Sequence, residues 1–377
     1  MARAYLDHAS SSPLRPDALE AMLPFLREHH ADPGRLHSEG RVTRVALEDA
    51  REQVAEFFGA RPREVVFTSS GTEAVNTAVW GALARRAAEG PGHVVTTAVE
   101  HSCVRDAIGR SDAEVTVVGV DRTGRFDAAD VIAALRPDTR LVTIQLANHE
   151  VGTLQPAAEV CAAVREHATV VHIDACAAAG RVAVDFRALD ADLCSVTAHK
   201  LGGPKGAGAL LVRRGLRFPP FLVGGAQERA RRAGIENVPA WVGFGAACAA
   251  VDVEREAAAQ RALLSVAARV LTGVPDVERF GSELAEATLP HLLCFGVHGV
   301  EAEPILLALD QRGVAAHSGS SCSSETLEPS PVLAAMGVDA DHSLRISVGW
   351  SSTAPDVERF VEVFPGIVER LRGLRSA

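Results

Sequence analysis

The sequence predicts an α/β protein: a large domain built on a mainly parallel sheet, followed by a smaller α+β domain at the C-terminal end. Two observations support this prediction. Short apolar runs bounded by turn residues alternate with segments that carry apolar residues at helical spacing, which is typical of a parallel sheet covered by helices. The chain also has 377 residues, more than one hydrophobic core usually holds, which favours two domains.

Seven short apolar runs are the expected strands of the large domain. They lie at 65–67, 94–96, 115–118, 141–146, 170–173, 193–197 and 209–212. Segments 48–58 and 156–166 are expected helices, and Pro156 stands at the first turn of the second, where a helix tolerates proline. These patterns together predict a seven-stranded sheet with helices on its faces.

A long Ala-rich stretch from Ala240 to about Leu271 predicts one helix that links the large domain to the C-terminal domain. Beyond it the elements become shorter, with expected strands at 291–295 and 344–348 and a closing helix over 356–374. We therefore expect three parts. An N-terminal segment, 1–15, packs with the small domain, the large domain spans 16–260, and the small domain spans 261–377.

The composition limits the classes of partner and compartment. A formal net charge of -10 argues against a nucleic-acid backbone or an anionic membrane as the main partner, because both favour basic surfaces. The first residues lack the apolar run of a signal peptide, and no stretch reaches the roughly 18 apolar residues of a membrane span. We therefore expect a cytoplasmic protein that binds neither nucleic acid nor a membrane.

The cysteines are more informative than the charge. There are seven, an odd count with no C-x-x-C pair, which favours reduced thiols over disulfides or a zinc site. Most lie in apolar surroundings, but Cys322 lies in the polar, Gly-containing segment 317–325, which predicts an exposed loop. A thiolate there can react with another sulfur, whereas the alternative is an incidental surface thiol.

Two segments of the large domain could hold a cofactor. The strand at 65–67 runs into Thr68-Ser-Ser-Gly-Thr-Glu73 and then a helical segment, and such a turn can bind a phosphate or simply cap the helix. The strand at 170–173 ends in Asp174, at the edge where open α/β sheets bind ligands. Asp174 can hold a protonated ring nitrogen of a cofactor or cap the next helix.

Lys200 is the candidate for covalent chemistry. It follows the strand at 193–197 and lies in the Gly-rich segment Ala198-His-Lys-Leu-Gly-Gly-Pro-Lys-Gly206, where glycines let the backbone approach a ligand closely. On composition alone Lys205 competes with it, and a surface lysine is a further alternative.

These segments belong to a wider set of motifs that occur in one order along nearly the whole chain. Beside the segments already quoted, the set comprises Tyr5-Leu-Asp-His8, Val99-Glu-His101, Asn148-His-Glu-Val-Gly152, His172-Ile-Asp-Ala175, Gly203-Pro-Lys-Gly206, Ser318-Gly-Ser-Ser-Cys322 and Arg345-Ile-Ser-Val-Gly349. In this set the chain resembles the class V, fold-type I enzymes that use pyridoxal 5′-phosphate (PLP), and specifically the cysteine desulfurases of the NifS/IscS type.

The resemblance implies a role for each matching residue. Lys200 would bind PLP covalently, Asp174 would pair with the ring nitrogen, and His101 would stack on the ring. Asn148 would reach the ring hydroxyl and the substrate, and Arg345 would bind the substrate carboxylate. The positions that match the phosphate-binding residues are Gly71, Thr72, Thr197 and His199. Cys322 would accept the sulfur of L-cysteine as a persulfide, with Lys200 and His101 assisting proton transfer.

Four positions depart from the family pattern. His149 replaces a second Asn, Ala177 replaces a Gln that bonds the ring hydroxyl, Ile235 replaces a Thr that reaches the phosphate of the neighbouring subunit, and Trp350 replaces an Arg. Ala177 cannot make the hydroxyl contact, so that contact is missing or comes from another group such as His149. These changes concern cofactor affinity rather than the reaction class.

The resemblance also implies partners, and it leaves alternatives open. A homodimer is expected, and so is an acceptor protein for the sulfur, which could serve iron–sulfur cluster assembly, tRNA thiolation, DNA phosphorothioation or another pathway. A selenocysteine lyase or another class V aminotransferase shares the fold and the lysine but has no need of Cys322. A non-catalytic scaffold for sulfur-relay partners is the alternative that Ala177 and Ile235 suggest.

Overall fold

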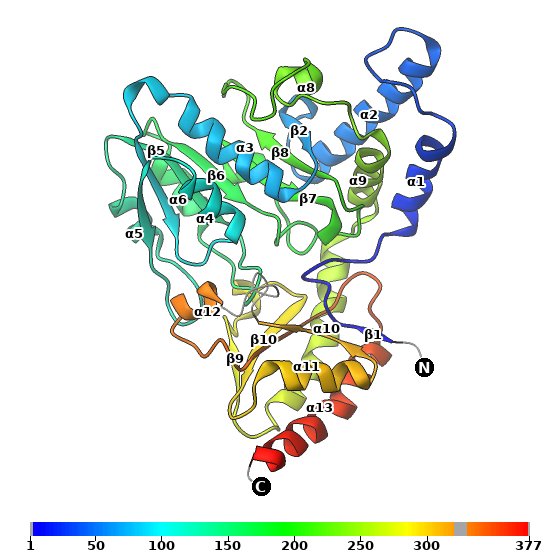
Figure 1. Ribbon diagram of the computed structural model, residues 1–377, viewed down its shortest axis with the longest axis vertical. Coiled ribbons are helices and arrows are strands. Elements are labelled where there is room, and N and C mark those ends of the chain that lie inside the picture. Colours follow the sequence, from blue (N-terminus) through cyan, green and yellow to red (C-terminus); the bar gives the residue numbers. More distant parts are fainter. Residues whose placement is uncertain (1–2, 320–329, 376–377) are drawn as a thin grey trace.

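The structure is a computed structural model that describes residues 3–319 and 330–375. Cys322, the predicted sulfur acceptor, lies outside the described residues. Figure 1 shows a broad upper part, coloured blue to green, and a narrower lower part, coloured yellow to red. The first residues of the chain lie beside the lower part. The two parts meet at the level where the site described below is found.

The upper part is built on a seven-stranded sheet in the order β2-β8-β7-β6-β5-β3-β4. The strands are β2 (Val65–Thr68), β3 (His93–Thr97), β4 (Glu114–Val118), β5 (Thr139–Gln145), β6 (Val170–Asp174), β7 (Leu193–Thr197) and β8 (Gly208–Val212). Only β8 runs against its neighbours in this sheet, and the other adjacent pairs are parallel. The predicted fold class, α/β with a mainly parallel seven-stranded sheet, is confirmed.

Helices cover both faces of this sheet (Figure 1). They are α1 (Pro16–Arg27), α2 (Ser38–Phe57), α3 (Gly71–Ala84), α4 (Ser102–Gly109), α5 (Ala128–Ala133), α6 (Ala157–Val164), α7 (Phe186–Leu189), the single turn α8 (Gln227–Ala230) and α9 (Val238–Ala250). Short 3₁₀ turns are η1 (Pro62–Glu64), η2 (Ala87–Glu89) and η3 (Ala198–Lys200).

The strands of this sheet other than the edge strand β4 are mainly apolar and fully buried, because helices cover both faces there. On β2, Val65 and Phe67 belong to one apolar cluster, while Val66, which points the other way, belongs to a second. The ring of Trp241 on α9 stacks on Phe67 with 4.9 Å between centroids. Continuous apolar runs, rather than alternating ones, are therefore the correct signal for this sheet.

The lower part has its own sheets and core. A four-stranded antiparallel sheet has the order β12-β13-β10-β9, and a parallel pair joins β1 to β11. The elements are β1 (Ala4–Tyr5), α10 (Val253–Leu271), β9 (Val277–Phe280), η4 (Ala285–Ala287), β10 (Leu292–Val297), α11 (Ala302–Gln311), β11 (Val314–Ala315), β12 (His317–Ser318), α12 (Pro331–Ala335), β13 (Ser343–Ser347) and α13 (Ala354–Arg375). Phe295, Phe360 and Phe364 pack in its core.

The single helix expected from Ala240 to about Leu271 is wrong. Helix α9 ends at Ala250, and α10 begins at Val253 after a break. Asp252 caps the second helix, because its carboxylate accepts a hydrogen bond of 3.0 Å from the Arg255 N–H. An Asp in this position satisfies an N–H at a helix start, so it favours a new helix over continuation. The domain boundaries at 15 and 260 stay a prediction.

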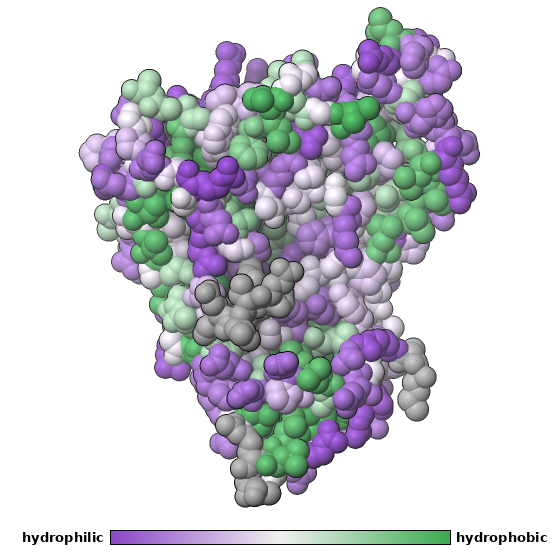
Figure 2. Space-filling model, in the orientation of Figure 1, coloured by the Kyte–Doolittle hydropathy of each residue, from purple (hydrophilic) through white to green (hydrophobic). Residues whose placement is uncertain are grey.

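The surface mixes polar and apolar residues. Figure 2 shows hydrophilic residues over much of one face, with apolar groups scattered between them. Among the described residues, no helix combines the length and the apolar character that crossing a membrane requires.

Candidate active site

A cavity of about 300 Å³ lies beyond the carboxyl ends of the central strands. The strand ends are in register there, since Gln145 pairs with Asp174 and Asp174 pairs with Ser195. Ligands bind at this edge in open α/β sheets. The predicted site residues that line the cavity are Gly71, Thr72, His101, Asp174, Thr197, His199, Lys200 and Arg345.

Lys200 lies in the turn η3, directly after β7, and its side chain is in the cavity. Its Nζ donates a hydrogen bond of 2.6 Å to the Ala9 carbonyl, and its own carbonyl accepts from Arg181 Nη2 at 2.7 Å and from Ser12 Oγ at 3.1 Å. Burial, with a further contribution from the Arg345 cation, lowers the pKa of Lys200 to about 8. The amine is therefore a competent nucleophile near neutral pH.

This pKa predicts how the reactivity of Lys200 depends on pH. Only the neutral amine attacks a carbonyl, so reductive methylation of Lys200 by formaldehyde should speed up as pH rises and level off above about pH 8. An ordinary lysine, with a pKa of about 10.4, keeps gaining rate to about pH 10. Mass spectrometry of the cofactor-free chain measures the rate. A rate at Lys200 that still rises steeply above pH 9 contradicts the lowered pKa.

Asp174 ends β6 and faces the same cavity. Its Oδ1 accepts a hydrogen bond of 2.9 Å from the Cys176 N–H. Two residues earlier, His172 is held by Thr143 and Ser195 at 2.8 Å on either ring nitrogen, and burial lowers its pKa to about 4. His172 is therefore neutral and supports the sheet, whereas Asp174 presents a carboxylate to a ligand.

The start of α3 forms another wall of the cavity. Ser70 caps this helix, since its Oγ accepts from the Glu73 N–H at 3.1 Å. Gly71 is required there, because a Cβ on it would lie 2.5 Å from the Cys176 Sγ. The backbone thus approaches the cavity closely, with the positive end of a 14-residue helix directed at a ligand.

Two histidines flank this wall. His199 Nδ1 lies 2.9 Å from Thr197 Oγ1, and burial, together with the Lys200 charge, lowers the pKa of His199 to about 4. His101 caps α4, and its Nδ1 accepts from the Cys103 N–H at 3.1 Å. This hydrogen bond makes Nδ1 an acceptor, so the proton of neutral His101 is on Nε2.

Arg345 brings a guanidinium from β13 of the lower part to the cavity. Nη1 donates to the His149 carbonyl at 2.8 Å, and Nη2 donates to Ser10 Oγ at 2.8 Å and lies 3.2 Å from Asp7 Oδ1. The side chain is only 1% exposed, and its Nε has no hydrogen-bond partner within the described part of the chain. A carboxylate in the cavity would satisfy it.

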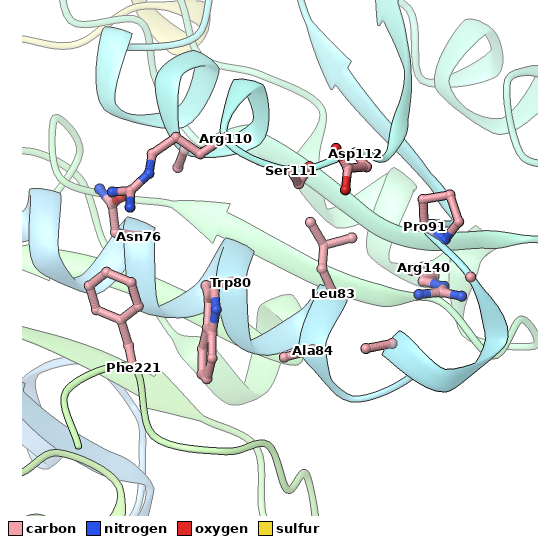
Figure 3. A pocket seen from close by; sticks show the side chains of 13 residues that line it. Asn76, Trp80, Leu83, Ala84, Pro91, Arg110, Ser111, Asp112, Arg140 and Phe221 are labelled. Carbon is pink, nitrogen blue, oxygen red and sulfur yellow. The ribbon is translucent and has the colours of Figure 1, made fainter. Parts of the chain in front are cut away.

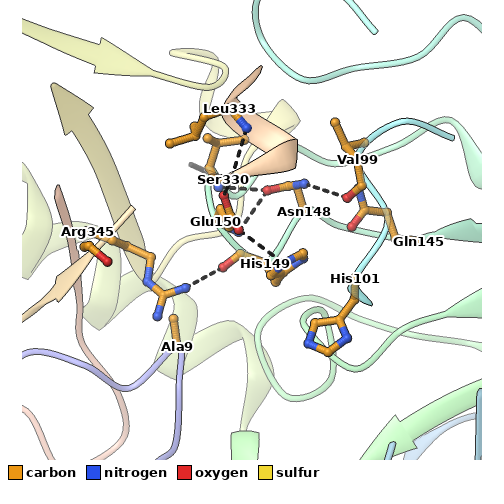
Figure 4. Close-up of polar contacts among 12 residues, drawn as sticks. Ala9, Val99, His101, Gln145, Asn148, His149, Glu150, Ser330, Leu333 and Arg345 are labelled. Atoms are coloured by element: carbon orange, nitrogen blue, oxygen red, sulfur yellow. Dashed lines mark hydrogen bonds and ion pairs between the residues drawn. The ribbon is translucent and has the colours of Figure 1, made fainter. Parts of the chain in front are cut away.

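Asn148 is not brought to the cavity. Its Oδ1 accepts from the Glu150 and Val151 N–H groups at 2.8 and 2.9 Å, and its Nδ2 donates to the Val99 carbonyl at 3.3 Å (Figure 4). The amide is therefore committed to a turn. The next residue, His149, lines the cavity instead.

Several lining residues were not predicted from sequence. They are Ala9, Ser10, Ser70, Cys103, Gln145, Ala147 and Cys176. Burial and the neighbouring Asp174 carboxylate raise the pKa of Cys176 well above its usual value, so this thiol stays protonated. The sequence around Cys176 gives no signal that distinguishes a residue lining a cavity from a residue of the hydrophobic core. Ala9 and Ser10 could not be predicted because they come from the distant N-terminal segment.

A second cavity, of about 710 Å³, lies on the outer side of the large part. Figure 3 shows Trp80 and Asn76 of α3 on one side of it, with Arg110 after α4 and Phe221 nearby. None of the predicted site residues that the structure describes lines it. The strand-end cavity is therefore the candidate active site.

Comparisons with known proteins show the family to which the chain belongs. Residues 4–360 match the family model described as aminotransferase class-V. The chain is 39% identical to a cysteine desulfurase of a Nostoc species over 99% of this chain and 95% of that protein. It is also 39% identical to cysteine desulfurase IscS of Dictyoglomus turgidum, over 98% and 95% of the two chains.

Solved structures give the same result. A NifS-like protein superimposes with a TM-score of 0.90 at 30% identity, covering 98% of this chain and 100% of that chain. SspA in complex with cysteine gives a TM-score of 0.81 at 30% identity, over 92% and 98% of the two chains. Enzymes of this class depend in general on PLP. These matches cover nearly the whole chain, and they show that the chain belongs to the cysteine desulfurase family of class V aminotransferases.

Proposed function

We propose that this chain is a PLP-dependent cysteine desulfurase that converts L-cysteine to L-alanine and passes the sulfur to Cys322 as a persulfide. The observation that carries the proposal is the cavity in which Lys200, Asp174, the start of α3 and Arg345 meet. An amine, a carboxylate, a helix start and a guanidinium suit a phosphorylated pyridine aldehyde and an amino acid. When bound, PLP draws electrons away from the α-carbon of the substrate.

The residues at hand fit this cofactor. Gly71 and Thr72 offer backbone N–H groups at the start of α3, and Thr197 and His199 add polar side chains to the same cavity. These residues would hold the phosphate. Asp174, at the end of β6, would hold the proton of the ring nitrogen. His149 Nε2 and Arg345 Nε are buried without a hydrogen-bond partner among the described residues, as expected of a site shaped for a polar ligand.

The remaining residues act on the substrate. Arg345 would bind its carboxylate. The Lys200 amine would link covalently to the cofactor, would be released when the substrate amine takes its place, and would then remove the α-proton. His101, protonated on Nε2, would exchange a proton with the substrate. The Cys322 thiolate would attack the substrate sulfur, so that an S–S bond forms as the C–S bond breaks. The carbon keeps the electron pair and takes up a proton to give alanine.

The function is tested with the purified, PLP-loaded chain. Incubation with L-cysteine and dithiothreitol should release alanine and sulfide in equal amounts. Cys322→Ser should keep the visible absorbance of the cofactor but lose roughly 10²-fold or more of the alanine formation, because the nucleophile is gone. Undiminished alanine formation by Cys322→Ser contradicts the persulfide role. Absence of alanine from the wild-type chain contradicts the proposed function itself.

Partners and compartment are part of the proposal. The persulfide requires an acceptor protein, and we propose a homodimer for the enzyme. The six described cysteines are all free thiols, which fits a reducing compartment such as the cytoplasm.

A further inference from the structure

His149 is the polar side chain of the cavity whose purpose is unexplained. It is 8% exposed, lines the cavity, and its Nε2 is buried without a hydrogen-bond partner in the part of the chain that the structure describes. Native proteins rarely leave such an atom unpaired, because its lost hydration is not replaced. Nε2 is buried beside Glu150, and Nδ1 has no hydrogen-bond partner among the described residues, so Nδ1 is the ring nitrogen left for a ligand in the cavity.

The chemistry of PLP indicates which contact is missing. PLP carries four polar groups: a phosphate, a ring nitrogen, an aldehyde and a ring hydroxyl. The start of α3 suits the phosphate, Asp174 suits the ring nitrogen and Lys200 suits the aldehyde, and all three line one cavity with His149. Ala177 also lines it but offers no polar side-chain group. The ring hydroxyl is therefore the one polar group of PLP without a partner, and His149 is a polar side chain of the cavity without an assigned contact.

The surroundings of His149 fix its ring in place. Its carbonyl accepts from Arg345, and its ring packs edge to face on His101 with 5.1 Å between centroids. Its Nε2 lies 3.6 Å from Glu150 Oε1, slightly beyond hydrogen-bond distance, and the other oxygen of Glu150 accepts from the Ser330 hydroxyl (Figure 4). A slight ring rotation lets Nε2–H donate to Glu150, which leaves Nδ1 as an acceptor.

We propose that His149 Nδ1 accepts a hydrogen bond from the ring hydroxyl of PLP, and that Glu150 and Ser330 are positioning residues that hold the imidazole for this contact. The inference rests on the proposed function, because it concerns the same cofactor. Burial and the nearby Lys200 cation lower the pKa of His149 well below its usual value, which keeps the ring neutral as an acceptor must be.

The geometry has a second consequence. Ser330 caps α12 and is the first described residue after segment 320–329, which contains Cys322. The hydrogen bond from Ser330 to Glu150 therefore joins the start of α12 to the residue beside His149. Removal of the Ser330 hydroxyl should weaken the cofactor contact without touching the cavity wall.

The test measures cofactor binding rather than turnover. Cofactor-free wild-type chain and His149→Phe, which keeps a ring of similar size but has no nitrogen, are titrated with PLP and with a PLP analogue whose ring hydroxyl is methylated. His149→Phe should bind PLP about tenfold more weakly than wild type, the scale of one or two hydrogen-bond energies. The two chains should bind the methylated analogue equally. His149→Asn, which restores a polar group, should recover part of the affinity.

The controls separate a contact from a general disturbance. His167→Ala removes an exposed histidine and should leave both dissociation constants unchanged. Ser330→Ala should weaken PLP binding by about threefold and spare the analogue. Equal PLP affinity of His149→Phe and wild type overturns the inference, and so does an equal loss for PLP and the analogue. If His149→Phe does not fold, the same comparison on His149→Asn decides. A wild-type chain that binds no PLP refutes the proposed function instead.

Discussion

Replacement of Lys200 by alanine should abolish the coloured, borohydride-reducible cofactor adduct and slow alanine formation from L-cysteine by roughly 10³-fold. Lys200 is the only lysine among the described residues that line the cavity, so no second amine can form the link. The same amine is the base for the α-proton. A hydrogen bond of 2.6 Å to the Ala9 carbonyl holds its Nζ in the cavity, and no other residue can supply an amine at that position.

The measurement combines visible absorbance, borohydride reduction followed by mass spectrometry, and alanine assay. Lys205→Ala is the matched control, because Lys205 is exposed in the same Gly-rich segment and does not line the cavity. It should keep the adduct and the activity. A Lys200→Ala variant that retains a reducible adduct shows that another amine holds the cofactor.

The second large effect concerns stability. Glu228→Ala should lower the free energy of unfolding by about 3 kcal/mol, because it removes the bidentate carboxylate of the buried Arg51 cation and leaves it only Glu48, 3.3 Å from Nε. The pair is bidentate, with 2.8 and 2.7 Å between the Arg51 nitrogens and the Glu228 oxygens, and both side chains are at most 2% exposed. Glu228 Oε2 also accepts from the Phe67 N–H at 2.8 Å, so an edge of β2 loses a partner too.

Urea denaturation of the cofactor-free chain measures this loss. Glu114→Ala is the control, since Glu114 pairs with Arg136 on the surface, where an ion pair contributes about 0–1 kcal/mol. A Glu228→Ala variant that unfolds at the same urea concentration as Glu114→Ala contradicts the prediction. Glu228→Gln, which keeps hydrogen-bonding groups, should fall between the two.

Most strands were predictable because the sheet, apart from its edge strand β4, is buried on both faces. Each apolar run around Val66, Leu141 and Leu193 stands where a strand is found. The direction of β8 was not predictable, because an apolar run looks the same in both directions and the Gly-rich turn after Lys200 permits a tight reversal. The break between α9 and α10 depended on one cap, Asp252, within a pattern that is otherwise helical.

The site was predictable where its residues follow strands. Asp174 and Lys200 stand at strand ends, and the topology brings such ends to one edge of the sheet. Asn148 was assigned to the cavity from family resemblance, but its side chain closes a turn on Glu150, a common use of Asn that sequence alone could have suggested. The contact of Ser330 with Glu150 spans 180 residues, and no local pattern indicates it.

The pairing of β1 with β11 also has a consequence for biosynthesis. Ala4 pairs with Val314, and Ser10 bonds Arg345, so these early residues find their partners only after residues more than 300 positions later have been made. Contacts of such high sequence separation form late in folding. The nascent chain can therefore complete its sheet of seven strands once Val212 has been made, but it gains a competent cavity only after Arg345 has followed.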